Sequence, residues 1–168
     1  MLKNNSGINM MTKDDYIQFF AEVRKVSKIE TLMPDESGLV SVRIDDAYNV
    51  NFQFVEATGK ILCFIEVAEL PKNASKEVYR DLLSGGLFGK ETAGGYFTLE
   101  PETETVVYNY FFDLSIVAED VEDFIATIEK TLQLCDIWAE RIHGILEKGD
   151  NTDDDSDEPP IGHTVFKP

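Results

Sequence analysis

Two pairs of glycines divide the middle of this chain into a helix, a loop and a strand. Before the first pair (residues 85–86), apolar residues recur at helical spacing over residues 75–84. Because glycine reaches left-handed backbone angles, this pair predicts the end of the helix. After the second pair (residues 94–95), apolar and aromatic residues predict a strand over residues 96–100. Such a short helix cannot bury its apolar side alone, so it must pack on a sheet or on another subunit.

The N-terminal part of the chain has the pattern of a single amphipathic helix. Thr12 and Asp15 have the spacing of a helix N-terminus, and apolar residues recur from there to about residue 29. Phe19 and Phe20 are adjacent, so their side chains point about 100° apart on a helix. We expect either one wide buried face or one ring left exposed for a partner.

Alternation of apolar and polar residues predicts strands. Residues 39–44 and 50–54 alternate, which indicates an antiparallel hairpin with one apolar and one polar face. Residues 61–68 are apolar on both faces, which predicts a strand covered on both sides. Residues 106–114 predict a further strand, also with aromatic residues on both faces.

The last regular element is a helix of about 40 Å over residues 120–146. A continuous apolar stripe follows it at three- and four-residue steps: Val121, Phe124, Ile125, Ile128, Leu132, Cys135, Trp138, Ile142 and Ile145. Such a stripe should cover a whole face of the sheet. The pattern predicts an α+β fold, an antiparallel five-stranded sheet with three helices in the order α-β-β-β-α-β-β-α.

Composition predicts one folded unit with unstructured ends. We expect a disordered N-terminus over residues 1–11, a domain over residues 12–147 and an acidic disordered tail over residues 148–168. The last eight residues of the tail, IGHTVFKP, are either a short docking element or simply a tail.

The net charge of −17 at pH 7 argues against nucleic acid as a partner and against binding to anionic membranes. No apolar run approaches the length of a membrane span, and the N-terminus lacks a secretory signal. Cys63 and Cys135 lie in apolar runs without metal-type spacing, which is typical of buried thiols in a reducing compartment. We therefore expect a cytoplasmic protein without membrane insertion.

A search for catalytic or ligand-binding motifs finds none that is complete. Residues 85–90 fail the spacing of a phosphate loop, and residues 153–164 fail that of a calcium loop. The two histidines lie apart from any recognisable nucleophile. Glu100 and Glu102 flank a proline and are the best paired carboxylates, although an exposed acidic turn explains them as well. We expect no catalysis, no cofactor and no metal site.

The best motif is LLSGGLF followed by GGYF, within residues 82–114. With the order of elements, the acidity and a closing helix that carries Trp138, it resembles the class I type III secretion chaperones, the Tir chaperone family. The resemblance covers residues 13–146, whereas the acidic tail has no counterpart in it.

This resemblance implies a bacterial homodimer that binds the extended N-terminal segment of one or more secreted effectors and keeps them soluble, without nucleotide. Components of the secretion apparatus are a further class of partner. An exposed strand edge accepts an extended segment while apolar pockets bind alternate side chains. Candidates for effector binding are Phe19, Phe20, Val42, Ile44, Phe52 and Phe54. Candidates for the dimer interface are Tyr79, Leu82, Leu83, Leu87, Phe88, Tyr96 and Phe97.

Two alternatives remain open on the sequence. One is a regulatory or interaction dimer of related fold, similar to the bacterial YbjN-like domains. The other is a small enzyme that uses Glu100 or Glu102, which would need a deep pocket with convergent polar groups.

Overall fold

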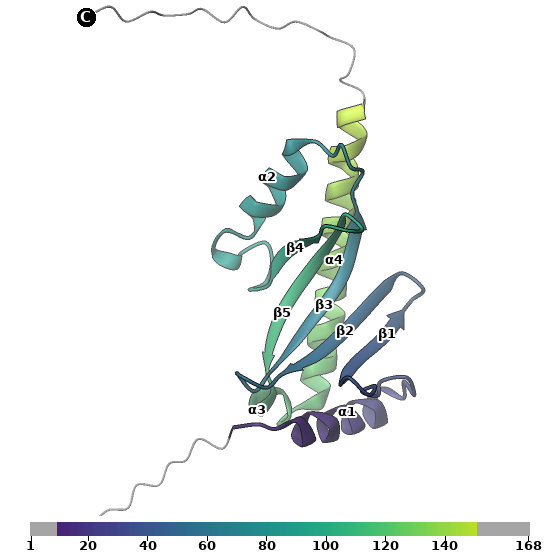
Figure 1. Cartoon of the computed structure of the whole chain (residues 1–168), viewed down its shortest axis with the longest axis vertical. Coiled ribbons are helices and arrows are strands. Elements are labelled where there is room, and N and C mark those ends of the chain that lie inside the picture. The colour runs from purple at the N-terminus through teal and green to yellow at the C-terminus, as the bar shows by residue number, and fades with distance from the viewer. Residues whose placement is uncertain (1–9, 151–168) are drawn as a thin grey trace, which may run out of the picture.

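The computed structural model describes residues 10–150, an α+β structure in which one antiparallel sheet packs against a long helix (Figure 1). In chain order, its elements are α1 (Lys13–Ser27), β1 (Leu39–Ile44), β2 (Tyr48–Val55), β3 (Lys60–Glu69), α2 (Lys76–Gly85), the 3-10 turn η1 (Leu87–Gly89), β4 (Tyr96–Glu100), β5 (Thr105–Asp113), α3 (Leu114–Val117) and α4 (Val121–Asp150). The predicted fold class and the order of the principal elements are confirmed.

The sheet has the strand order β1-β2-β3-β5-β4. In the sequence, α2 and β4 come between β3 and β5, but in the sheet β5 pairs with β3 and β4 lies outside β5. The two edges of the sheet are therefore β1 and β4. All four pairings are antiparallel, and the register aligns Val42, Val50, Ile65 and Tyr108 in one row across the sheet. All four of these side chains are buried, so this row lies on the core face.

Helix α4 covers the core face along its length (Figure 1). The predicted stripe is buried at its centre, where Phe124, Ile128, Cys135, Trp138 and Ile142 each expose less than a tenth of their surface. Spacings of three and four residues keep these side chains on one side of the helix. The helix runs to Asp150, three residues into the segment that the sequence analysis assigned to the tail.

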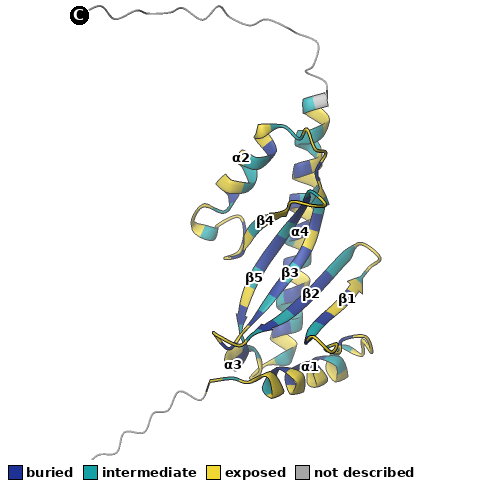
Figure 2. Cartoon of the chain, in the orientation of Figure 1, coloured by how far each residue is buried: buried dark blue, intermediate teal, exposed yellow. Residues whose placement is uncertain are grey.

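The opposite face of the sheet is open in a single chain. Leu62 and Phe64 of β3 lie on it and are only half-buried, so the expectation that β3 is covered on both sides is wrong for one chain. Beside them, Phe111 stacks on Tyr96 with ring centroids 6.4 Å apart, and both rings are exposed. No helix of the described residues packs over this patch (Figure 2).

Helix α1 packs across one end of the sheet and α4. Its N-terminus is a capping box in which Thr12 and Asp15 satisfy each other's backbone N–H groups. Phe19 and Phe20 are both buried, so neither ring is left for a partner. Both rings contact Phe124, with centroids 5.0 and 6.3 Å apart, because α4 crosses the wide side of α1 and fills the angle between them.

Two local features differ from the sequence-based expectation. A fourth helix, the single turn α3, follows β5 directly, and it begins where the Asp113 carboxylate accepts a hydrogen bond from the N–H of Ser115 (3.1 Å). In addition, Gly86 has right-handed angles (φ −70°), whereas left-handed angles occur later, at Phe88 (φ 59°) and Gly89 (φ 65°). The glycine pair therefore does not end α2 through a left-handed residue.

Candidate functional site

An exposed apolar surface covers α2, the loop after it and β4. The relative exposure is 80% for Leu83, 62% for Leu87 and 86% for Phe88. Figure 2 shows this end of the molecule largely as exposed and half-buried ribbon. An apolar patch of this kind on a soluble protein usually marks an interface. We call it the α2–β4 surface: Tyr79, Leu82, Leu83, Leu87, Phe88, Phe97 and Leu99.

Most of the predicted dimer residues meet on this surface. Tyr79, Leu82, Leu83 and Phe97 line one groove of about 160 Å³ between α2 and β4, while Leu87 and Phe88 lie in the loop that follows α2. Tyr96 differs, because successive strand residues point to opposite faces and its ring stacks on the open face of the sheet. Leu99 was not among the predicted dimer residues, but it lines the same groove, because it lies two positions after Phe97 on β4 and points to the same face.

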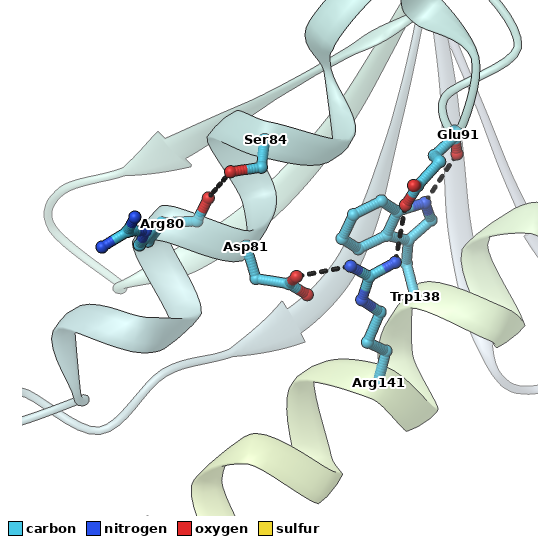
Figure 3. Close-up of polar contacts among 6 residues, drawn as sticks. All are labelled: Arg80, Asp81, Ser84, Glu91, Trp138 and Arg141. Atoms are coloured by element: carbon cyan, nitrogen blue, oxygen red, sulfur yellow. Dashed lines mark hydrogen bonds and ion pairs between the residues drawn. The ribbon is translucent and has the colours of Figure 1, made fainter.

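The position of α2 depends on a close contact with α4. A Cβ atom at Gly85 would lie 2.2 Å from Cη2 of Trp138, so only glycine allows the backbone of α2 to lie against this indole. The Trp138 Nε1–H in turn donates to the backbone oxygen of Glu91 (2.9 Å), which fixes the loop after α2 (Figure 3).

Arg141, one turn further along α4, ties the same elements together. Its guanidinium pairs with Asp81 of α2 and, at 2.7 Å, with Oε2 of Glu91, and it lies 4.6 Å from the Trp138 ring centroid (Figure 3). The hydrogen bond with Asp81, followed by that with Glu91, raises the pKa of Arg141. One side chain of α4 thus orients both α2 and its loop.

A second apolar site lies toward the other end of α4, between α1, the β1–β2 hairpin and α4 (Figure 1). It is a groove of about 150 Å³, and within residues 10–150 the polar residues that line it are Ser27 and Glu129. We call it the α1–α4 groove. It is lined by Phe20, Val23, Ser27, Ile29, Leu32, Val42, Ile44, Phe52, Phe124, Ile125, Ile128, Glu129 and Leu132.

Four of the six candidate effector-binding residues, Phe20, Val42, Ile44 and Phe52, line this groove. The other two, Phe19 and Phe54, lie in the core beside it, where Phe54 stacks on Tyr16 with centroids 5.6 Å apart. All six except Ile44 are buried, so Phe20, Val42 and Phe52 belong to the core as well as to the lining of the groove.

The accessible rim of the groove comes from other residues. Ile29 is exposed, and Ile125 and Leu132 of α4 are half-buried. The apolar stripe of α4 contained Ile125 and Leu132, but only the packing of α1 across α4 shows that they border an open groove. Strand β1, which contributes Val42 and Ile44, is also an edge of the sheet, and in the part of the chain that the structure describes it pairs with β2 alone.

The side chains best suited to catalysis are two buried thiols and two carboxylates on an exposed turn. Cys63 and Cys135 are buried free thiols, and burial raises the pKa of Cys135 to about 12 and that of Cys63 further. Glu100 and Glu102 lie exposed at the β4–β5 turn, where the Glu102 N–H donates to Oε1 of Glu100 (3.1 Å). Among residues 10–150, no group of three or more His, Cys, Asp or Glu side chains could hold a metal ion. The calcium-like aspartates lie outside the described residues.

None of the helices within residues 10–150 is both long and apolar enough to cross a bilayer.

The family of the chain follows from its sequence. A model of the Tir chaperone protein (CesT) family matches residues 19–139, which is well over half of the chain. The chain belongs to the Tir chaperone protein (CesT) family. The resemblance to class I type III secretion chaperones is thereby confirmed, and this CesT-family chain is a type III secretion chaperone. No sequence among curated proteins matches it closely enough to count as a relative.

Solved structures show the same fold. The CesT-family chain is similar to a chain of the ExsC–ExsE complex, with a TM-score of 0.67 and 18% identity over 78% of this chain and 96% of that one. It is also similar to a chain of the HopA1–SchA chaperone–effector complex, with a TM-score of 0.56 and 16% identity over 80% of this chain and 95% of that one. A third similar chain comes from the structure of the Yersinia pestis type III secretion chaperone SycH in complex with a fragment of YscM2. Its TM-score is 0.52, and the identity is 16% over 71% of this chain and 98% of that one. At these identities the likeness establishes the fold.

Proposed function

We propose that this CesT-family chain is a cytoplasmic homodimer that binds the extended N-terminal segment of a secreted effector and keeps it soluble, without catalysis. The observation that carries the proposal is the presence of two separate apolar sites toward opposite ends of α4. One site suits a second copy of the chain, and the other suits an extended segment.

The α2–β4 surface supports the dimer. Leu83, Leu87 and Phe88 expose most of their surface in a single chain. A monomer would keep these apolar side chains in contact with water, which is unfavourable in free energy. A two-fold dimer pairs one patch with its own copy, so the exposed residues of both chains are covered at once. Gly85 and Arg141 hold α2 against α4, so the patch is presented on a fixed element rather than on a loose one.

The α1–α4 groove supports effector binding. Its lining is almost entirely apolar, and the free edge of β1 runs beside it. A bound segment in extended conformation would form main-chain hydrogen bonds with β1 and place alternate apolar side chains in the groove. The similar chains of the HopA1–SchA and SycH–YscM2 structures come from complexes of two proteins, which is consistent with this use of the fold.

A charge placed on the rim of the groove tests this proposal. In Ile125→Asp, the aspartate would meet the bound segment, so we expect binding of an effector N-terminal fragment to weaken about 10- to 100-fold, equivalent to losing about 1.5–3 kcal/mol of apolar burial. The matched control is Ile137→Asp, an exposed isoleucine on the same helix outside the groove. Affinity is measured by calorimetry on full-length protein, with the fragment taken from an effector that co-purifies with the chain. Equal affinities for the two variants, with folding intact, would exclude the groove as the binding site.

A further inference from the structure

The α1–α4 groove is an apolar surface that a single folded domain leaves uncovered. Ile29 is exposed at its rim, and Ile44, Ile125 and Leu132 are half-buried. Water in contact with these side chains makes an empty groove unfavourable, so any apolar segment held close by gains free energy by entering it.

The chain itself carries such a segment after the described residues. Eighteen residues follow Asp150, and their apolar side chains are confined to the last eight, IGHTVFKP, which contain Ile161, Val165 and Phe166. Helix α4 connects the two parts directly, because it lines the groove with Phe124 and Leu132 and ends at Asp150.

The length of the C-terminal segment matches the distance to the groove. The groove residues of α4 lie 18 to 26 positions before Asp150, which is about 27–39 Å along a helix at 1.5 Å per residue. An extended chain of 11 residues reaches about 36 Å, and one of 15 residues about 50 Å, at 3.3 Å per residue. Ile161 and Val165 can therefore reach the groove from the end of their own α4.

The distribution of charge also favours residues 161–168 as the segment that docks. Five acidic residues occupy positions 153–158, and a chain with a net charge of −17 repels them. Residues 161–168 contain no acidic residue and one lysine, Lys167. Among the described residues that line the groove, only Glu129 is charged, and Lys167 has the opposite charge.

We propose that residues 161–168 dock in the α1–α4 groove of their own chain and cover it until an effector segment displaces them. The inference rests on the proposed function, because the groove is also the proposed effector site. Tethering places the segment at a millimolar effective concentration, so weak contacts are enough to fill the groove. An effector segment competes with it, and only a segment with more contacts, including those along β1, displaces it.

A spin label tests the docking on the full-length chain without any effector. A nitroxide on Pro160→Cys labels the tail alone, because the native thiols of Cys63 and Cys135 are buried, and it leaves residues 161–168 unchanged. We expect it to broaden the methyl signals of Ile44, Ile125 and Ile128. Adding Phe166→Asp should abolish the broadening, whereas Thr152→Asp, which places the same charge in the tail outside the apolar segment, should preserve it.

Each outcome of the spin-label and binding experiments either supports or overturns the proposal. Groove signals that are not broadened, or that stay broadened with Phe166→Asp, overturn the proposal. The proposal is also overturned if spin-labelled chains broaden the groove signals of isotope-labelled chains that carry no spin label, because the segment would then occupy a partner's groove. For displacement, Phe166→Asp should bind an effector fragment several-fold more tightly than the wild type and Thr152→Asp, and equal affinities would contradict it. If no variant binds a fragment, the proposed function fails while the spin-label result still decides the docking.

Discussion

Replacing Leu83 by aspartate separates dimer formation from folding. The side chain is 80% exposed in a single chain, so it contributes little to the stability of the monomer. We expect the free energy of unfolding of the monomer to change by no more than about 0.5 kcal/mol, as for other surface substitutions.

The effect on the dimer should be much larger. Burying a leucine side chain contributes about 1.5–3 kcal/mol, and a two-fold interface contains the residue twice. Loss of both contacts costs about 3–6 kcal/mol, which raises the dimer dissociation constant roughly 100- to 10,000-fold. Each chain would also bring a carboxylate into the apolar interface, which increases the loss further.

Sedimentation velocity over a concentration series measures this change. The wild type should sediment with twice the mass of the 19.0 kDa chain, and Leu83→Asp as a single chain with an unchanged circular dichroism spectrum. Ile116→Asp is the matched control, because Ile116 is 66% exposed on α3, away from α2 (Figure 1). The reasoning is refuted if Leu83→Asp keeps the wild-type dissociation constant, or if Ile116→Asp loses the dimer equally.

Three further predictions concern the interior and the first helix. Gly85→Ala should lower the free energy of unfolding in urea by about 1–3 kcal/mol, because its Cβ overlaps the Trp138 ring, and a wild-type value would contradict the contact. Cys63 and Cys135 should not react with a thiol reagent at pH 8 until the protein unfolds, since burial raises the pKa of both thiols; rapid native labelling would show that they are accessible. Hydrogen bonds from the N-cap threonine lower the pKa of Asp15 below 3.8, so its stabilising contribution is complete above about pH 4 and disappears as the pH falls through the folded pKa. The difference in free energy of unfolding between wild type and Asp15→Asn should therefore become smaller from pH 6 to pH 3. A difference that stays constant over this range would contradict a stabilising role of the Asp15 carboxylate.

Local patterns in the sequence predicted most of the elements. Alternation in residues 39–44 and 50–54 depends on each strand having one buried face, which a single segment reveals. The capping box at Thr12 and the stripe of α4 are likewise local signals, and the structure has both.

Features that depend on packing between distant segments were not predictable in this way. Gly85 is glycine because Trp138, 53 residues later, lies against it, and the sequence suggested a backbone reason instead. Phe19 and Phe20 are both buried because α4 fills the angle between them. The apolar residues of β3 suggested cover on both faces, but Leu62 and Phe64 face an open surface in one chain.

The candidate sites show the same division. The exposure of apolar residues near the glycine loop was predictable, because α2 is too short to bury its apolar side alone. Their role in a dimer interface stays a prediction. The effector candidates were chosen by residue type, and five of the six are buried. The accessible rim, Ile29, Ile125 and Leu132, is created by the crossing of α1 and α4, which no local pattern encodes.

The mass of the complex with an effector fragment tests whether the chain binds one effector as a dimer. The full-length chain would be co-expressed with the N-terminal fragment of an effector that co-purifies with it, and the complex measured by light scattering coupled to size exclusion. The account predicts two copies of the 19.0 kDa chain with one fragment. A complex with a single copy of the chain, or no complex while the dimer is intact, would contradict it.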